Sequence, residues 1–259
     1  MCKTNRFSGI FLRVQLVLMF MGVTLLQAQV QQEHHRSSES SVQVEEIASP
    51  EIQLLLPGFK PGVVYQGNEV RVFDQLNYNM LLDFMVVVSE DGEWLAMDDP
   101  HLIDSLRMEG KLFHHIAGHG FFEHITGNDR QGVYVKHYVD VNAETVAQGA
   151  YGTTNRTTSI DVVRSLVDPS TSDIAERTIE IDSPSGQEIH IYLKKDKEFY
   201  LMNNGEPHPI RSQRSVTRAF PEHSRELRRF LRSTPIDYRN EDDIIRLSEY
   251  IYSLDDQGS

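Results

Sequence analysis

Residues 69–97, EVRVFDQLNYNMLLDFMVVVSEDGEWLAM, constrain the fold of this chain more than any other stretch. β-Branched, aromatic and aliphatic residues lie on both sides of Asn77. Residues 78–89 are nearly continuous in apolar side chains, which is typical of a strand covered on both faces. Asp91-Gly92 then accepts the positive backbone angles of a tight hairpin turn. The stretch therefore predicts the first antiparallel meander of a β-sheet.

Strand-like patterns continue along the chain to about residue 210. Residues 132–140 alternate between apolar and polar positions, which is typical of a strand with one buried face and one wet face. After the first meander, strands are expected at residues 111–116, 120–126, 132–140, 177–182, 188–193 and 198–202. Residues 141–176 are interpreted as an excursion from the sheet. Residues 51–210 are therefore predicted to form one β-rich domain.

The hydrophobic period changes in residues 211–259, which are predicted to form a helical tail that packs on the sheet. A short helix is expected at residues 212–219, Pro221 suits the first position of a second helix, and Asn240 suits the N-cap of a third. Together these patterns predict an α+β fold with two or three C-terminal helices. Its antiparallel β-sheet is expected to be a curled sheet, a sandwich or a partly open barrel.

The first 50 residues carry an export pattern. Residues 1–28 are expected to be a secretory signal peptide, because a basic start precedes an apolar run and a small-residue cleavage site ends at Ala28. The alternative is a membrane anchor, but the apolar run of about 13 residues is shorter than the roughly 20 needed to cross hydrocarbon. Residues 29–50 are rich in Gln, Glu and Ser and are predicted to form a disordered polar tether. The mature protein is then exported, periplasmic or secreted, with no transmembrane span.

The charge balance narrows the classes of partner. The formal net charge of the chain is −13, and binding to nucleic acid or to an anionic membrane depends on a basic face that releases counterions. We therefore expect no nucleic-acid partner, although a local basic patch is compatible with this balance. Cys2, the one cysteine, lies in the signal segment. The mature chain is thus expected to have no disulfide and no thiolate metal site.

Several spaced residues carry a resemblance to a protein family. They are the opening Tyr65-Gln66-Gly67, the Leu76, Tyr78 and Asp83 element that runs into a hydrophobic strand, the VYVKHY segment at residues 133–138, and the hairpin at residues 198–210. With the secretory start and the helical tail, this order resembles uncharacterised secreted or periplasmic proteins of the Bacteroidota over roughly residues 65–254. The resemblance implies a location in the cell envelope and no particular activity.

Five histidines lie close together in the sequence, at positions 114, 115, 119, 124 and 137. Neutral imidazole binds zinc, copper or nickel, and two strands joined by a loop can bring three rings together. His114, His119 and His124 are therefore the candidate metal ligands. The spacing matches no metal signature such as His-Glu-x-x-His. The alternative is that these histidines are half-buried residues of the sheet.

A basic cluster in the tail stands out against the acidic remainder of the chain. The candidate partner-binding residues are Arg218, Arg225, Arg228, Arg229 and Arg232. Such a cluster can bind an acidic partner or a phosphorylated headgroup. The alternative is a solvated helical face whose arginines pair with Glu222, Glu226 and the acidic residues 242–243.

The sequence carries no strong catalytic signature. The turn at residues 183–186 is the closest approach to a serine nucleophile elbow, and the acidic side chains of residues 83–99 lie in turns or at strand ends. We therefore expect no catalytic residue and no cofactor. The leading hypothesis is a non-catalytic cell-envelope protein that binds an envelope protein or an outer-membrane complex, through a sheet edge or the helical tail. The alternatives are a metal-dependent or carboxylate hydrolase of envelope glycan or peptide, and a periplasmic carrier of an apolar ligand.

Overall fold

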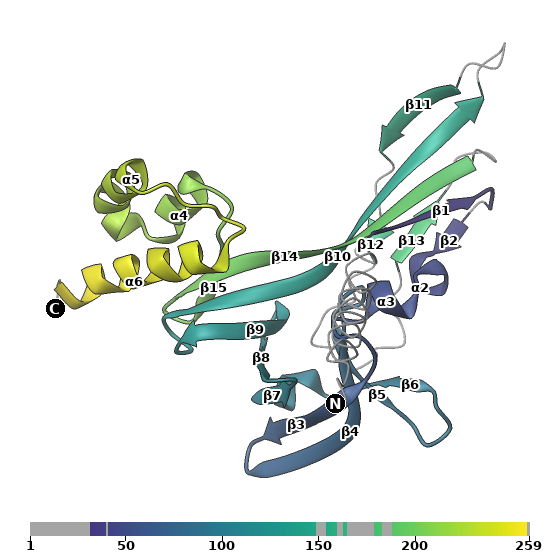
Figure 1. Ribbon diagram of the computed structural model, residues 1–259, viewed down its shortest axis with the longest axis horizontal. Coiled ribbons are helices and arrows are strands. Elements are labelled where there is room, and N and C mark those ends of the chain that lie inside the picture. Colours follow the sequence, from purple (N-terminus) through teal and green to yellow (C-terminus); the bar gives the residue numbers. More distant parts are fainter. Residues whose placement is uncertain are drawn as a thin grey trace, which may run out of the picture.

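The computed structural model describes residues 32–39, 41–148, 154–159, 163–164, 179–182 and 188–257 (Figure 1). The chain is mostly antiparallel β-sheet with helices at its C-terminal end, and the sheet does not close into a barrel. The α+β fold expected from the sequence is therefore confirmed. The predicted signal peptide, residues 1–28, lies outside the described residues.

One large curled sheet contains most of the strands. They are β1 (Gln32–Ser37), β3 (Lys60–Gln66), β4 (Glu69–Asn79), β5 (Phe84–Val88), β6 (Trp94–Ala96), β7 (Ser105–Met108), β8 (Lys111–Ile116), β9 (Gly120–Gly127), β10 (Gly132–Gln148), β11 (Thr154–Ser159), β14 (Glu188–Asn203) and β15 (Glu206–Pro209). Their order is β1-β14-β10-β9-β8-β7-β3-β4-β5-β6, with β11 paired to β10 and β15 paired to β14. A smaller sheet of three strands has the order β12 (Val163–Arg164), β13 (Ile179–Asp182) and β2 (Ser41–Gln43).

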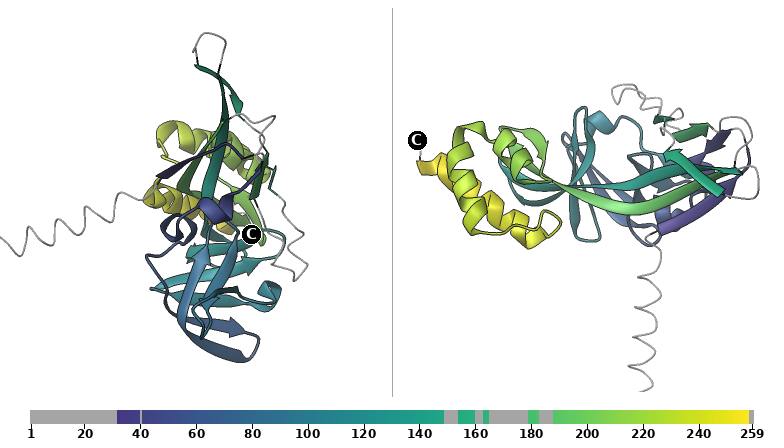
Figure 2. Two further views of the ribbon diagram at one scale, coloured as in Figure 1. Left: turned by 90° about the vertical axis from the view of Figure 1, so that its right-hand side faces the viewer. Right: turned by 90° about the horizontal axis from the view of Figure 1, so that it is seen from above.

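Strands β10 and β14 run the length of the molecule and contribute to the two larger hydrophobic cores of the described residues. Their antiparallel register extends from Val133 opposite Leu201 to Val146 opposite Glu188. Figure 2 shows the C-terminal helices at one end of this pair and strands β1 and β2 toward the other. Because the pair is so long, the same face of β10 contributes to both cores.

The helices follow the signals that the sequence contains. They are α2 (Val44–Ile47), α3 (Pro50–Gln53), the 3-10 turns η1 (Pro100–Leu102) and η4 (Pro221–His223), and α4 (Gln213–Ala219), α5 (Ser224–Ser233) and α6 (Glu241–Gln257). Ser212 and Ser215 form a capping box at the start of α4. At the start of α6, the backbone N–H of Asp243 donates a hydrogen bond of 3.1 Å to Asn240 Oδ1.

The helical tail packs on one end of the sheet. Buried side chains of the helices, among them Leu227 and Leu247, share one hydrophobic core with Val133 and Phe199 of β10 and β14. The hydroxyl of Tyr252 donates hydrogen bonds of 3.1 and 3.0 Å to the carbonyl groups of Gly132 and Met202. This anchoring fixes the position of α5 relative to the sheet. Among the described residues, no helix combines the length and the apolar character needed to cross a membrane.

The prediction of a disordered polar tether over residues 29–50 is wrong for the part of it that the structure describes. Strand β1 pairs with β14 over six residues, beginning with Gln32 opposite Lys194. The carboxylate of Glu33 accepts hydrogen bonds from the backbone N–H and the hydroxyl of Ser49, the N-cap of α3. Val44 is fully buried. The polar sequence folds because β14 supplies its ladder hydrogen bonds, and scattered apolar residues reach the core.

Candidate functional site

Helix α5 carries a dense group of arginines. Its inner side is fixed by Leu227, which is fully buried, and by Phe230, whose ring stacks on Tyr250 of α6 with centroids 4.0 Å apart. Leu231 also packs against the tail core. An amphipathic helix held in this way must present its remaining side chains to solvent.

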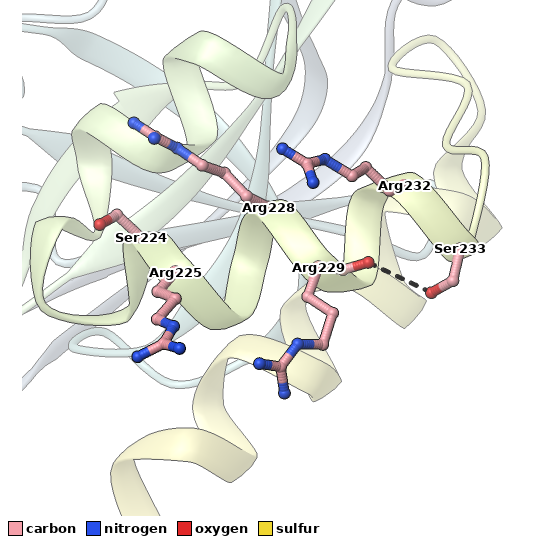
Figure 3. A pocket seen from close by; sticks show the side chains of 6 residues that line it. All are labelled: Ser224, Arg225, Arg228, Arg229, Arg232 and Ser233. Carbon is pink, nitrogen blue, oxygen red and sulfur yellow. Dashed lines mark hydrogen bonds between the residues drawn. The ribbon is translucent and has the colours of Figure 1, made fainter.

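The solvent side of α5 consists of four exposed arginines, which we call the arginine surface: Arg225, Arg228, Arg229 and Arg232. At 3.6 residues per turn, these positions fall within an arc of roughly 100° on the helix. Figure 3 shows Arg228 and Arg232 leaving the helix on one side and Arg225 and Arg229 on the other. The side chains, with Ser224 and Ser233, line a hollow of about 490 Å³. The hollow is therefore an open basic surface on one helix.

The arginine surface has no acidic counterpart within the part of the chain that the structure describes. No ion pair joins its four guanidinium groups to a carboxylate there, and two acidic residues of α6 pair with other cations. Asp243 pairs with Arg246 at 2.6 Å. Glu241 lies 3.9 Å from Lys197 of β14. The alternative pairing with Glu222, Glu226 and residues 242–243 is thus not present as direct ion pairs among the described residues, although Glu222 and Glu226 stand three residues before Arg225 and Arg229.

Arg218, the fifth predicted partner-binding residue, lies on α4. Its side chain is exposed, but it does not line the hollow of the arginine surface. Arg211, just before α4, differs from all of these, because its guanidinium pairs with the carboxylate of Glu198 on β14. That pairing raises the pKa of Arg211. Arg211 is thus neutralised by a carboxylate of the sheet, whereas the four arginines of α5 share one exposed surface.

The residues that carry the family resemblance form a polar contact between the first meander and β10. Lys136 Nζ donates hydrogen bonds of 2.7 Å to each carboxylate oxygen of Asp83, and Tyr78 donates one of 2.6 Å to Asp83 Oδ1. Asp83 has a positive φ of 58° and lies at the turn between β4 and β5. Gly120 is required beside it, since a Cβ there would lie 2.2 Å from Asp83 Oδ2. These residues therefore hold the sheet together.

A buried acid lies on β9. Glu123 receives a hydrogen bond of 2.6 Å from Lys111, and its other carboxylate oxygen lies 2.6 Å from Nε2 of His137. Burial alone would raise the pKa of Glu123, but the hydrogen bonds and charges of His137 and Lys111 outweigh burial and lower it. The two partners thus hold Glu123 ionised, and His137 is explained by this contact.

The three predicted metal ligands are separated by the β8–β9 hairpin. His114 and His124 lie together, with ring centroids 5.6 Å apart, whereas His119 is exposed in the connecting turn. Within the described residues, the set of three possible ligand groups that lie within 4.8 Å of one another is Glu222, His223 and Asp255, which includes none of them. Sequence reasoning missed this second set, because its members come from η4 and α6 and are joined only by the fold.

The predicted sheet edge is present at β6, the end strand of the large sheet. Trp94 and Leu95 of β6 are 38% and 50% exposed, and Val70 and Val72 on the outer part of β4 are 60% and 72% exposed. This edge is apolar and lies on the opposite side of the sheet order from β1. The long apolar run expected to line a carrier cavity instead contributes Met80 and nearby residues to the core.

Comparisons with known proteins do not extend these observations. No family model, no curated protein and no solved structure matches the chain.

Proposed function

We propose that this chain is a non-catalytic exported protein of the cell envelope that binds an acidic segment of a partner protein through the arginine surface of α5. The observation that supports this proposal is the set of four exposed guanidinium groups without a carboxylate counterpart among the described residues. Arginine suits such a role because its planar fork of donors matches carboxylate geometry.

Four like-charge contacts act against α5, and the Glu222–Arg225 and Glu226–Arg229 spacings offset only part of them. The pairs Arg225–Arg228, Arg225–Arg229, Arg228–Arg232 and Arg229–Arg232 have the spacings at which helix side chains are neighbours. Like charges at such spacings each cost roughly 0.2–0.5 kcal/mol. An acidic partner reduces this repulsion. Binding of the partner is therefore favoured by the repulsion free energy that is present in the free protein.

The charge of the remaining chain favours a local acidic segment over an extended anionic surface. With these four arginines removed from the formal net charge of −13, the other residues sum to −17. A membrane or a nucleic acid carries negative charge over an area larger than α5 and repels this remainder. An acidic segment on a protein can contact α5 alone, across an arginine row of roughly 10 Å.

The test is binding of a fluorescent peptide of twelve alternating Asp and Glu residues, followed by anisotropy. The key variant carries Arg225→Gln, Arg228→Gln, Arg229→Gln and Arg232→Gln, and glutamine keeps the helix propensity. With about 0.5 kcal/mol for each exposed charge pair, the variant is expected to bind roughly 30-fold more weakly. Raising the salt from about 0.1 M to 1 M shortens the screening length from about 10 Å to 3 Å and should abolish binding of the parent.

A matched variant controls for the change in net charge. It replaces four exposed arginines outside α5: Arg71, Arg107, Arg130 and Arg239. This control is expected to bind the peptide as the parent does. Equal losses in both variants, or binding that survives the α5 variant, would contradict the proposal. Preferential binding of the parent to phosphatidylglycerol vesicles over the peptide would contradict the protein partner.

The same two variants then test the partner in an envelope extract. A protein retained by the parent and by the control, and released from the α5 variant, is expected to bring an acidic segment to α5. A protein retained by all three but lost when Trp94 and Leu95 are replaced by serine would move the binding site to the β6 edge.

A further inference from the structure

His114 and His124 occupy neighbouring positions on one face of the β8–β9 hairpin. In the strand register, His114 is opposite Phe122 and Leu112 is opposite His124, so the two histidines are diagonal neighbours on the same face. Their ring planes meet at 61°. Tyr134 of β10 closes the group, with its ring centroid 5.0 Å from that of His124 and 6.0 Å from that of His114.

Both imidazoles bury a nitrogen that nothing in the described chain satisfies. The Nε2 atoms of His114 and His124 are shielded from solvent and have no hydrogen-bond partner among the described residues. A buried polar atom without a partner costs about 1–3 kcal/mol. Two such atoms on adjacent rings therefore require an explanation, and a bound ion is one of the recognised explanations.

The surroundings of His114 favour the form of the ring that binds metal. Asp129 Oδ1 lies 3.7 Å from Nδ1 of His114, which is beyond hydrogen-bond distance, and the charge of this exposed carboxylate attracts a proton to Nδ1 rather than to Nε2. A carboxylate behind the non-coordinating nitrogen is the usual outer partner of a metal-binding histidine.

We propose that His114 and His124 bind a divalent transition-metal ion of the zinc and copper class through their Nε2 atoms. Imidazole is a preferred ligand for both ions, and neither requires a thiolate. Metal–nitrogen bonds of about 2.0–2.1 Å at a tetrahedral centre place two ring centroids roughly 5 Å apart, close to the observed 5.6 Å. The remaining coordination positions belong to water or to another small ligand.

Two other groups of side chains could bind metal and must be removed from the measurement. His34 Nε2 and His190 Nδ1 lie 3.2 Å apart across β1 and β14. The set of Glu222, His223 and Asp255 lies at the end of α6. A parent variant with His34→Ala and His223→Ala disables both groups. The first group loses one of its two imidazoles, and the second loses its single imidazole.

The experiment titrates Zn²⁺ into this parent variant, purified without a histidine tag, at neutral pH by calorimetry. We expect one equivalent to bind, and we expect His114→Gln or His124→Gln to weaken binding at least 10-fold. The matched control, His101→Gln, replaces an exposed histidine of η1 and should bind Zn²⁺ as the parent does. Unchanged binding in both glutamine variants, or no binding by the parent at about 100 µM Zn²⁺, would overturn the proposal.

A second measurement keeps the proposal testable if a glutamine variant does not fold. Cu²⁺ is added to the parent at less than one equivalent, and electron paramagnetic resonance counts the nitrogen nuclei coupled to the ion. Coupling to two imidazole nitrogens supports the site. A spectrum of aqueous copper, or of copper coupled to a single nitrogen, overturns it. The metal site and the arginine surface share no residue, so either can fail alone.

Discussion

Lys136 should contribute more to stability than any exposed lysine, because it satisfies the carboxylate of Asp83 on both oxygens. Both hydrogen bonds measure 2.7 Å, and Lys136 Nζ also donates to the carbonyl groups of His119 and Phe121 at 2.9 and 3.1 Å. The side chains of Lys136 and Asp83 are 15% and 28% exposed. The pair is thus largely withdrawn from water.

The expected magnitude follows from this burial. Removal of one partner of a buried ion pair costs about 3–5 kcal/mol, and the residual exposure of Asp83 places the cost at the lower end. Lys136→Met, which keeps the aliphatic stem, should lower the free energy of unfolding by about 3 kcal/mol. For a domain of this size, that corresponds to a fall in Tm of roughly 6–12 °C.

Urea denaturation of four proteins tests this reasoning: the wild type, Lys136→Met, Asp83→Asn and the double variant. The double-mutant cycle should yield a coupling free energy of about 2 kcal/mol. Lys194→Met provides the matched control, because Lys194 is 48% exposed and lies 4.0 Å from Asp196. It should cost less than about 0.5 kcal/mol. Additive single variants, or equal costs for Lys136→Met and Lys194→Met, would refute the argument.

Three further predictions concern separate parts of the molecule. Burial alone would raise the pKa of Glu33, but hydrogen bonds from Ser49 and His35 outweigh it and lower the pKa. The contribution of Glu33 to stability is therefore complete above the ordinary value of 4.5 and is lost as the pH falls through the lowered pKa. The unfolding free energies of wild type and Glu33→Gln should converge below pH 4.5 in chemical denaturation, and a constant difference would contradict this assignment. His119→Ala should leave the stoichiometry and affinity of Zn²⁺ binding unchanged in calorimetry, because His119 lies exposed in the turn; a loss of the bound equivalent would show a three-histidine site. Arg228→Gln removes two like-charge neighbours and should raise the unfolding free energy by about 0.5 kcal/mol in low salt, while it weakens peptide binding in the anisotropy assay; a stability loss would contradict the repulsion argument.

The sequence predicts the sheet better than it predicts where strands break. The Asp91-Gly92 turn forms as expected, with a φ of 86° at Gly92. The apolar run at residues 78–89, however, is divided between β4 and β5, which pair with each other. Met80 and Leu81 in the connection are buried like strand residues. The hydrophobic pattern of a sequence indicates which residues are buried but not where the backbone turns. The turn at Asp83 therefore could not be predicted from that pattern.

The N-terminal segment shows a different limit of sequence reasoning. Residues 32–37 have a composition that cannot form a core, and by themselves they have no reason to be ordered. Their partner strand β14 begins more than 150 residues later, with Ser37 opposite Ile189. Local composition cannot report a partner at that separation. The segment is ordered by contacts that exist only in the fold, among them the ladder with β14, the Glu33–Ser49 hydrogen bonds and the stacking of His34 on Tyr192.

The two candidate sites also differ in how far the sequence predicts them. The arginine surface could be predicted because its residues are neighbours on one helix, where spacing alone decides which side chains share a face. The histidines could be predicted only in part. His114 and His124 share a face through the hairpin register, while His119 is displaced by a turn in which Gly118 and Gly120 have φ values of 76° and 80°. The prediction of three ligands assumed that the loop would bring His119 back to the other two rings, and this turn does not do so.

The two proposed sites should also be energetically independent, although successive residues of β10 contact both. Val133 and Val135 pack in the tail core beneath α5, and Tyr134 between them faces His114 and His124 on the other side of the sheet. Shared contact does not by itself produce coupling. An effector changes the affinity at a second site only by its difference in affinity for two states of the protein. Strands β10 and β14 are packed against the helices in one arrangement. Zn²⁺ therefore has no alternative packing of these strands to stabilise. Saturating Zn²⁺ should therefore leave the dissociation constant of the acidic peptide unchanged within twofold, a coupling below about 0.4 kcal/mol. A larger shift would reveal a second arrangement of β10.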